Sequence, residues 1–328
     1  MSERLAFVTG GTGFVGAAVI RALCAEGTRV RALVRPGSDR SNLAELDVEL
    51  VEGDLSSREA LLAGMTGCDE VHHCAALYAF WSADPAEFIE SNVEGTRRII
   101  QEAVEAKVSR FVHCSSVATV APIRGKAATE DSQADPDKAP GPYKRSKILS
   151  EHEALRLAGE GAPVVVVNPA APVGPGDIKP TPTGQMVLDF LEGRMPAFVD
   201  TSLNVVDVDD VARGHLLAAR KGRVGERYIL GGENLTLEEI LGLLAEASGR
   251  KAPTLCLPHW VPEMVARFSE AWAKVSGRPP RVALESARLA RHHMRFDDTK
   301  AREELGHSSR PAREALTRAV EWFTRDVG

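Results

Sequence analysis

The stretch from Thr9 to Gly16 constrains this chain more than any other, because three glycines recur in it with the spacing Gly-x-x-Gly-x-x-Gly. An apolar segment, Leu5 to Val8, stands before the glycines, and an apolar helical pattern follows them. A second apolar segment, Arg29 to Val34, completes the unit. The motif is informative in this context of strand, turn, helix and second strand, which predicts a βαβ unit.

Each glycine has its own physical task in such a turn. Gly10 stands where a Cβ would clash, Gly13 lets the backbone approach a pyrophosphate at the helix N-terminus, and Gly16 lets the helix pack closely on the sheet. The context favours a dinucleotide site over a glycine turn without a ligand.

The end of the second strand separates the two nicotinamide cofactors in such folds. A carboxylate there binds the ribose 2′-hydroxyl of NAD, whereas an arginine accommodates the 2′-phosphate of NADP. Here Arg35 ends the strand, and no carboxylate lies between Val34 and Gly37. A guanidinium can hold a phosphate through two parallel hydrogen bonds. We therefore predict NADP(H) as cofactor, and NAD stays open if Arg35 is only a solvated loop residue.

Composition and charge argue against several other classes of function. The 328 residues are 44% hydrophobic and 26% charged, and their net charge is −6, with basic residues scattered among acidic ones. This balance is ordinary for a globular protein and does not favour nucleic-acid binding. No apolar run approaches the ~18 residues of a membrane span, and the first strand begins too early for a signal peptide. We expect a cytoplasmic protein.

The cysteines and two histidines do not predict a metal site. The five cysteines are odd in number and lack Cys-x-x-Cys spacing, so we interpret them as small buried residues in a reducing compartment. His72 and His73 are adjacent on an expected strand. Adjacent strand residues point to opposite faces, so these two side chains cannot chelate one ion together.

The first half of the chain alternates short apolar segments with helical ones up to about Val167. This alternation predicts a doubly wound parallel sheet with helices on both faces, a Rossmann fold. The clearest helix runs from Pro85 to Ala106. The expected strands are Leu5–Val8, Arg29–Val34, Val48–Val51, Glu70–Cys74, Arg110–His113 and Pro163–Val167.

We expect an NADP-binding domain over residues 1–170 and a smaller, mostly helical substrate region over 171–203 and 232–328. Residues of about 204–231 are expected to return to the first domain. There, a strand-like segment from Asn204 precedes a helix that Asp209 and Asp210 would cap.

Tyr143 and Lys147 open a helix and are the expected source of the chemistry. Residues four apart lie on one helical face. A phenol with a pKa near ~10 transfers protons poorly at neutral pH, and a nearby ammonium lowers that pKa. Lys147 would tune Tyr143 and bind the nicotinamide ribose. The hydroxyls of Ser115 and Ser116, at the end of the fifth strand, could hold the substrate oxygen.

Taken together, Thr9–Gly16, the Ser115-Ser116 pair and Tyr143-x-x-x-Lys147 resemble the extended short-chain dehydrogenase/reductases over essentially the whole chain. Within that superfamily, the chain is most similar to the branch with dihydroflavonol 4-reductase and the hopanoid-associated sugar epimerases. The segments that resemble the latter are Leu33–Ser38, Tyr143–Lys147, Asn168–Gly184 and Tyr228–Thr236.

The resemblance implies roles for individual residues. The family's catalytic serine matches Ser116, its tyrosine acid/base matches Tyr143, and its lysine matches Lys147. Asn92 matches an asparagine that supports the site, and Asn168 with Pro169 matches a turn on the nicotinamide side. The residues that match cofactor contacts are Gly10, Thr12, Gly13, Phe14, Gly16, Arg35, Asp54, Leu55, Ala75, Ala76, Tyr143, Lys147, Asn168 and Pro169.

The expected substrate is a small carbonyl compound or a sugar. In sugar-nucleotide members an arginine grips the nucleotide, and Leu203 stands at that position here. The absence of this arginine favours a smaller or more apolar carbonyl compound as substrate. The arginines Arg281, Arg288, Arg291 and Arg295 could supply the missing positive charge instead. The candidates for lining the pocket are Phe80, Trp81 and Val173.

Two expectations concern surfaces. Residues His259 to Val275 place large apolar side chains at helical spacing, which fits either core packing or contact with a membrane surface or a lipid-like substrate. The superfamily often dimerises through helices that match Pro85–Ala106 and Tyr143–Leu157, so a homodimer is expected by analogy alone.

The predicted activity is reversible hydride transfer between a nicotinamide cofactor and a carbon that bears oxygen, as in a dihydroflavonol-reductase-like oxidoreductase. Tyr143 would move the proton, and Ser116 would fix the oxygen. One alternative is a hopanoid-associated sugar epimerase or dehydratase that retains its nicotinamide cofactor. A second is a cofactor-binding scaffold without turnover, which the intact Ser116, Tyr143 and Lys147 set argues against.

Overall fold

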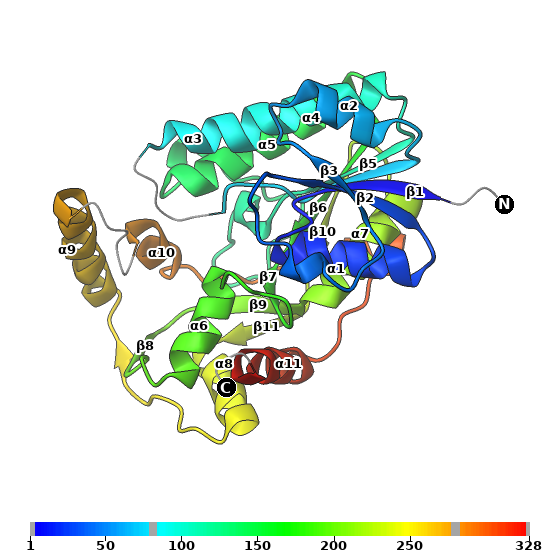
Figure 1. Cartoon of the computed structure of the whole chain (residues 1–328). Coiled ribbons are helices and arrows are strands. Elements are labelled where there is room, and N and C mark those ends of the chain that lie inside the picture. The colour runs from blue at the N-terminus through cyan, green and yellow to red at the C-terminus, as the bar shows by residue number, and fades with distance from the viewer. Residues whose placement is uncertain (1–3, 79–83, 277–282, 326–328) are drawn as a thin grey trace.

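The computed structural model describes residues 4–78, 84–276 and 283–325 (Figure 1). Within these residues, seven strands form one parallel sheet, which confirms the predicted fold class. Every strand expected in the first half of the chain is present. In spatial order the strands are β10 (Arg227–Leu230), β6 (Val164–Pro169), β5 (Arg110–Cys114), β4 (Glu70–His73), β1 (Leu5–Thr9), β2 (Arg29–Val34) and β3 (Glu49–Glu52).

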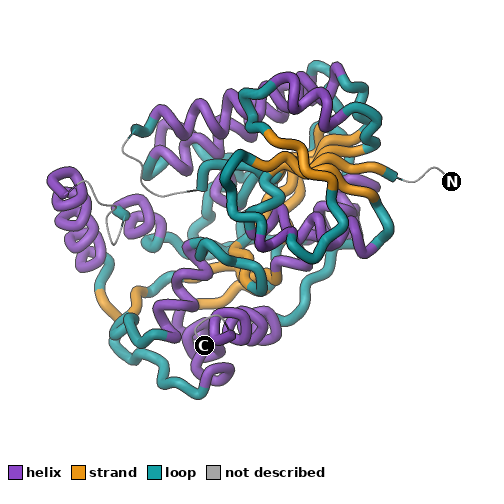
Figure 2. The backbone as a smooth tube through the Cα atoms, viewed as in Figure 1, coloured by secondary structure: helices purple, strands orange, loops and turns teal. Residues whose placement is uncertain are grey.

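Helices cover both faces of this sheet, as Figure 1 and Figure 2 show. On one face lie α2 (Arg58–Met65), α4 (Gly95–Glu105) and α5 (Pro142–Gly159), and on the other lie α1 (Phe14–Ala25) and α7 (Val208–Lys221). The strands are therefore apolar on both sides. On β1, Phe7 packs into the α2, α4 and α5 side, whereas Ala6 and Val8 pack into the α1 and α7 side.

The strand order changes direction between β1 and β4. The chain builds β2 and β3 on one side of β1 and then crosses to place β4 on its other side. In an open parallel sheet, ligands bind outside the carboxyl ends of the strands at such a point. This topology positions the candidate site.

The helix predicted over Pro85–Ala106 is present but is not uniform. It consists of α3 (Ala86–Phe88), a π-helical segment from Ile89 to Glu94, and α4. π-Helical turns occur mostly as single-turn bulges and are frequent at functional sites. Here the segment contains Asn92, whose side chain reaches the loop after β4.

The smaller part of the molecule contains a sheet as well as helices. Among the described residues, β11 (Glu233–Thr236), β9 (Ser202–Asp207) and β7 (Ala171–Val173) pair in this order. The edge of the main sheet beside β6 is occupied by β10, so β9 does not join that sheet. The other elements are α6 (Pro182–Leu191), β8 (Phe198–Val199), α8 (Leu237–Ser248), β12 (Cys256–Leu257), α9 (Trp260–Ser276), α10 (Leu284–Leu289) and α11 (Ala312–Arg325).

The cap of α7 differs by two residues from the prediction. The N-cap is Asp207, whose side chain accepts a hydrogen bond from the backbone N–H of Asp209. Asp209 and Asp210 lie in the first helical turn instead. The reason is that β9 runs directly into α7, so the last strand residue has the extended backbone that a cap requires.

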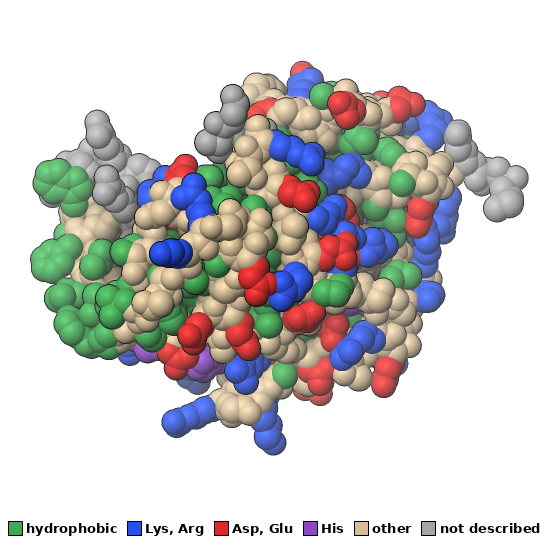
Figure 3. Space-filling model, turned by 90° about the horizontal axis from the view of Figure 1, so that it is seen from below, with side chains coloured by type: hydrophobic (Ala, Val, Ile, Leu, Met, Phe, Trp, Pro, Cys, Tyr) green, Lys and Arg blue, Asp and Glu red, His purple; other side chains and the backbone are tan. Residues whose placement is uncertain are grey.

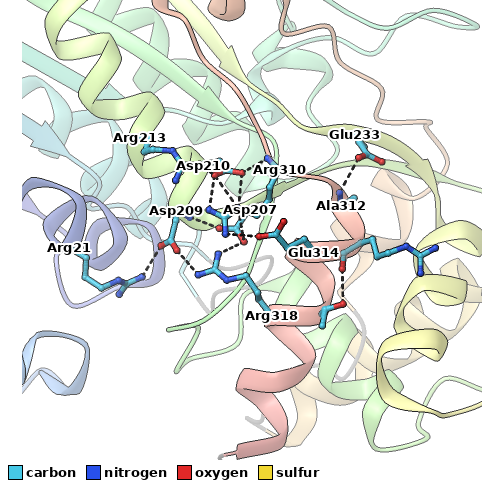
Figure 4. Close-up of polar contacts among 12 residues, drawn as sticks. Arg21, Asp207, Asp209, Asp210, Arg213, Glu233, Arg310, Ala312, Glu314 and Arg318 are labelled. Atoms are coloured by element: carbon cyan, nitrogen blue, oxygen red, sulfur yellow. Dashed lines mark hydrogen bonds and ion pairs between the residues drawn. The ribbon is translucent and has the colours of Figure 1, made fainter. Parts of the chain in front are cut away.

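A network of ion pairs attaches α11 and the segment before it to the start of α7 (Figure 4). The fully buried Asp210 carboxylate accepts hydrogen bonds from the Arg310 backbone N–H at 2.7 Å and from its Nη2 at 3.0 Å. Arg318 donates to Asp207 Oδ2 at 2.5 Å and to Asp209 Oδ2 at 2.6 Å. The network thereby joins the C-terminal helix to the nucleotide-binding sheet.

Two other expectations concern membrane-spanning helices and the oligomeric state. Within the described ranges, no helix is both long and apolar enough to cross a bilayer. The homodimer remains a prediction.

Replacing Asp210 with alanine should lower the free energy of unfolding by about 3 kcal/mol, because the backbone N–H and guanidinium of Arg310 lose their buried acceptor and Asp207 lies farther away, at 3.6 Å. Urea unfolding measures this change. The matched control is Arg313→Ala, which breaks an exposed ion pair with Glu246 between α11 and α8 and should cost less than about 1 kcal/mol. Equal losses in the two variants would contradict the importance given to the network.

Candidate active site

The glycine turn after β1 requires glycine for steric reasons that the structure makes explicit. Gly10 has φ +71°, and a Cβ on it would lie 2.6 Å from the backbone nitrogen of Ala75. A Cβ on Gly16 would lie 2.2 Å from the carbonyl oxygen of Gly10. Gly13 caps α1 without a side chain, so no side chain satisfies the N–H groups of the first turn. This end of α1 fits the phosphates of a dinucleotide.

Adjoining cavities of about 440 and 700 Å³ lie along this turn and share Gly10, Thr12, Gly13, Arg35 and Ala76. They bring together every predicted cofactor residue except Asn168. The larger cavity is also lined by Asp54, Leu55 and Ala75, and the smaller by Phe14, Gly16, Ser116, Tyr143, Lys147 and Pro169.

Arg35 differs from the other arginines near the end of β2. Its side chain is exposed and lines both cavities. By contrast, Arg31 Nε donates to Glu49 Oε2 at 2.9 Å, and Arg40 pairs with Glu52 at 2.5 Å.

Asp54 lines the larger cavity as an ionised group. Its Oδ1 accepts hydrogen bonds from the Ser56 hydroxyl at 2.6 Å and from the Ser56 backbone N–H at 2.8 Å. These bonds lower the pKa of the Asp54 carboxyl below its ordinary value.

The predicted catalytic residues Ser116, Tyr143 and Lys147 all line the smaller cavity. Lys147 Nζ donates a hydrogen bond to the carbonyl oxygen of Cys114 at 3.1 Å, which holds the ammonium against the end of β5. The Ser116 Oγ accepts a hydrogen bond from the Ala118 N–H at 3.1 Å and caps a short 3₁₀ turn. The neighbouring Ser115 hydroxyl is buried and has no hydrogen-bond partner among the described residues.

Burial controls the protonation of Tyr143 more than Lys147 does. Burial, followed by the nearby Tyr78 and Glu285, raises the pKa of Tyr143 well above its ordinary value. The Tyr78 ring lies 5.0 Å from the Tyr143 ring, centroid to centroid. Burial lowers the pKa of Lys147. The expected lowering of the Tyr143 pKa is therefore outweighed in this structure, and the phenol is protonated at neutral pH.

Asn168 has a different position from the expected turn. It lies fully buried on β6, and its Nδ2 donates to the carbonyl oxygen of Ser116 at 3.1 Å and to Glu151 Oε2 at 2.5 Å. Glu151 also binds Arg227 of β10 through a buried ion pair at 2.5 Å. Asn168 thus positions the Ser116 loop from below the cavity, while Pro169 lines the cavity itself.

Sequence reasoning did not identify Glu151, although a signal was present. Glu151 follows Lys147 by four residues, so the two side chains share one face of α5. The Glu285 carboxylate of α10 was also missed. It accepts a hydrogen bond from the Lys144 backbone N–H at 2.8 Å, close to the start of α5. No local pattern links residues that are 141 positions apart.

Asn92 bridges the loop after β4 and the tyrosine helix. Its Oδ1 accepts a hydrogen bond from the Leu77 N–H at 2.7 Å, and its Nδ2 donates to Ser146 Oγ at 2.9 Å. This arrangement orients α5 against the carboxyl end of β4.

A further cavity of about 320 Å³ extends from Ser116 and Tyr143 toward the smaller part of the molecule. Leu203 lines it, and among its described lining residues the one cation is Lys144. The lining is largely apolar and includes Ala171, Pro172, Met186, Leu237, Leu289, Met294 and Phe296.

The candidate substrate residues fall in different places. Val173 is not among the described residues that line this cavity, and it is buried in the same hydrophobic cluster as Val187 and Phe190. Phe80, Trp81 and Arg281 lie outside the described residues.

Of the three described arginines that could have replaced the lost cation, Arg295 is exposed and does not line this cavity, and the other two are engaged elsewhere. Arg288 donates to the Pro140 carbonyl oxygen at 3.2 Å, and Arg291 pairs with Glu263.

The apolar face of α9 is exposed rather than packed in the core. Phe268 and Trp272 are each 70% exposed, and Trp260, Met264 and Val265 are exposed as well. Figure 3 shows hydrophobic side chains gathered at the left of the molecule, where α9 lies. Core packing is therefore wrong for these five residues. The reason is that small residues, Ala266 and Ala273, face inward and leave the large side chains outside.

Comparison with known proteins agrees with this geometry. Residues 6–231 match the model of the NAD dependent epimerase/dehydratase family. A Synechocystis protein that carries the name of dihydroflavonol 4-reductase is 44% identical over 97% of this chain and 94% of its own length. The sterol demethylase protein B of Methylococcus capsulatus is 38% identical over 96% of this chain and 97% of its own length.

One solved structure is similar to this chain over nearly its whole length. The crystal structure of gox2253 superposes with a TM-score of 0.88 at 46% identity and covers 99% of both chains. Matches of this extent establish the family and make a scaffold without turnover the wrong alternative. The chain is therefore an enzyme of the NAD dependent epimerase/dehydratase family, within the extended short-chain dehydrogenase/reductases.

Proposed function

We propose that this enzyme is an NADP(H)-dependent ketoreductase that acts on an apolar carbonyl compound. The observation that carries the proposal is the apolar cavity beside Ser116 and Tyr143, in which Leu203 stands where nucleotide-sugar enzymes need a cation. A sugar nucleotide would leave its phosphate charges against apolar side chains, at a large cost in desolvation. Two relatives carry the names of a dihydroflavonol 4-reductase and a sterol demethylase protein, and neither name refers to a nucleotide sugar.

The proposed reaction assigns one task to each residue. The nicotinamide cofactor, when bound, supplies the hydride. Ser116 and Tyr143 hold the carbonyl oxygen, and Tyr143 donates its phenolic proton to that oxygen as the alcohol forms. Lys147, held by the Cys114 carbonyl oxygen, orients the cofactor ribose and stabilises negative charge on the phenolate. The apolar cavity excludes water from the reacting carbon.

Replacing Tyr143 with phenylalanine should lower the rate of ketone reduction by roughly 10²- to 10⁴-fold, because the proton donor is lost. The raised pKa of Tyr143 also predicts a pH dependence. Alcohol oxidation needs the phenolate, so its rate should rise with pH through the alkaline range, and reduction should not gain from alkali. Initial rates in both directions at several pH values measure this.

Tyr78→Phe is the matched control, since it keeps the ring that packs on Tyr143 and removes only the hydroxyl. We expect less than about a tenfold change in rate. The alkaline rise of alcohol oxidation should begin at a lower pH, because Tyr78 helps to raise the pKa of Tyr143. An unchanged rate of ketone reduction in Tyr143→Phe would contradict the role of Tyr143 as proton donor.

The proposed NADP preference depends on Arg35. Arg35→Ala should weaken NADPH binding by roughly 10- to 100-fold, because the charge-assisted hydrogen bonds to the 2′-phosphate contribute about 1.5–3 kcal/mol. It should leave NADH binding nearly unchanged, since NADH lacks that phosphate. Calorimetric titration of both cofactors measures the difference. Arg31→Ala is the control, because that guanidinium binds Glu49 and carbonyl oxygens near α2. Tightly retained NAD⁺ in the purified protein would overturn the assignment.

The substrate class can be tested with a set of compounds whose polarity differs. We expect NADPH consumption with polycyclic and long-chain ketones, and none with UDP-glucose. Leu203→Asp should slow the reduction of apolar ketones by at least about tenfold and leave NADPH affinity intact, because a carboxylate would have to be desolvated against the substrate. Interconversion of nucleotide sugars without net NADPH consumption would establish the epimerase alternative instead.

In the same assay, α9 can be tested as a surface that meets lipid. Its exposed Trp and Phe side chains are of the kind that bind at a bilayer interface. Phe268→Ser should therefore slow reduction of a ketone carried in phospholipid vesicles and leave reduction of a short, water-soluble ketone unchanged. Equal rates of the variant and the natural enzyme with both ketones would contradict peripheral membrane contact.

A further inference from the structure

Two cysteines and a histidine meet beneath the cofactor cavity, on the α7 side of the main sheet. Cys74 directly follows β4, Cys114 is the last residue of β5, and His215 lies on α7. The two sulfur atoms and a His215 ring nitrogen all lie within 4.8 Å of one another. The spacing of these residues in the sequence, 40 and 101 positions, contains no metal-binding pattern.

Strand register explains why the side chains converge. β4 and β5 are parallel neighbours in which His73 pairs with His113, so Cys74 and Cys114 come next, side by side. His73 points to the α4 and α5 side, where its ring meets Thr96. Because strand residues alternate, Cys74 and Cys114 point to the opposite side, toward α7.

His215 is an unusual buried residue. Its side chain is fully buried, and neither ring nitrogen has a hydrogen-bond partner among the described residues. A buried polar group without a partner is costly and calls for an explanation such as an ion. The ring nitrogen nearest the two thiols is in position to coordinate a metal ion together with them.

We propose that Cys74, Cys114 and His215 form a binding site for a zinc-type divalent cation. Thiolate and imidazole are the donors that Zn²⁺ prefers, and a Cys₂His set leaves one coordination position open. Binding forms two metal–sulfur bonds and one metal–nitrogen bond and releases the two thiol protons to solvent. The two thiolates balance the charge of the ion.

The present spacing is close to what such a site requires. With metal–sulfur bonds of about 2.3 Å, tetrahedral geometry places two sulfur atoms about 3.8 Å apart. The two sulfur atoms therefore need to approach each other by at most about 1 Å, and each sulfur atom and the ring nitrogen by slightly more. Cys74 and Cys114 also line the cofactor cavity, so water from that cavity can take the fourth position.

The site has a direct link to the active site. The carbonyl oxygen of Cys114 accepts the hydrogen bond from Lys147 Nζ. An ion that fixes the Cys114 side chain therefore also restrains the backbone group that holds this lysine. The proposal does not depend on the identity of the substrate or on the NADP preference.

Cobalt(II) is the probe that tests the site, because its absorption spectrum reports thiolate ligands directly. Titration of the full chain, kept reduced by a phosphine, should give a sulfur-to-cobalt charge-transfer band that saturates at one ion per chain and disappears when Zn²⁺ is added. Cys74→Ser, Cys114→Ser and His215→Gln should each weaken cobalt binding by at least about 100-fold, since loss of a ligand costs more than loss of a supporting group.

Cys256→Ser is the matched control, since Cys256 is an exposed cysteine on β12. The cobalt spectrum of this variant should equal that of the natural chain. Circular dichroism shows whether each variant is folded, and Cys114→Thr replaces Cys114→Ser if the latter does not fold. The absence of a charge-transfer band in the natural chain overturns the proposal. A band that survives in the folded Cys74, Cys114 and His215 variants overturns it as well, as does a Cys74–Cys114 disulfide that the phosphine fails to reduce.

Discussion

The close approach of two backbones at the carboxyl ends of β1 and β4 is the constraint on which this structure depends. A Cβ on Gly10 would lie 2.6 Å from the Ala75 nitrogen, so the turn after β1 closes over the end of β4 only because glycine stands there. That closure directs the N-terminus of α1 toward the cavity and places the cofactor turn beside the Ser116 loop. The carboxyl ends of β1, β4 and β5 then form one continuous rim around the site.

The reactive groups are held by buried polar contacts that come from several elements. Glu151 of α5 binds Arg227 of β10 and Asn168 of β6, and Asn168 in turn holds the carbonyl oxygen of Ser116. Glu285 of α10 lies at the start of α5 and helps to raise the pKa of Tyr143. Buried hydrogen bonds therefore hold the Ser116 loop, and the smaller part of the molecule acts on the tyrosine electrostatically.

Local sequence patterns predicted most of the main sheet and the helices that cover it. The βαβ unit, the alternation of apolar strands and the four-residue spacing of Tyr143 and Lys147 depend on neighbours in the chain, and neighbours are visible in a sequence. What the sequence did not reveal depends on distant contacts. β9 pairs with β7 and β11, while β10 occupies the edge of the main sheet beside β6. The exposure of Phe268 and Trp272 depends on which face of α9 the rest of the molecule covers.

The sequence by itself determined the strand, turn and helix at Gly10, the arginine at the end of β2, and the residues that could carry acid/base chemistry. It determined them because steric limits and helical spacing act over a few residues. The tertiary structure alone decided that burial raises the pKa of Tyr143, that Asn168 supports Ser116 from below, and that Cys74, Cys114 and His215 meet. Burial and convergence are properties of packed elements, and no local pattern encodes the distance between residues 101 positions apart.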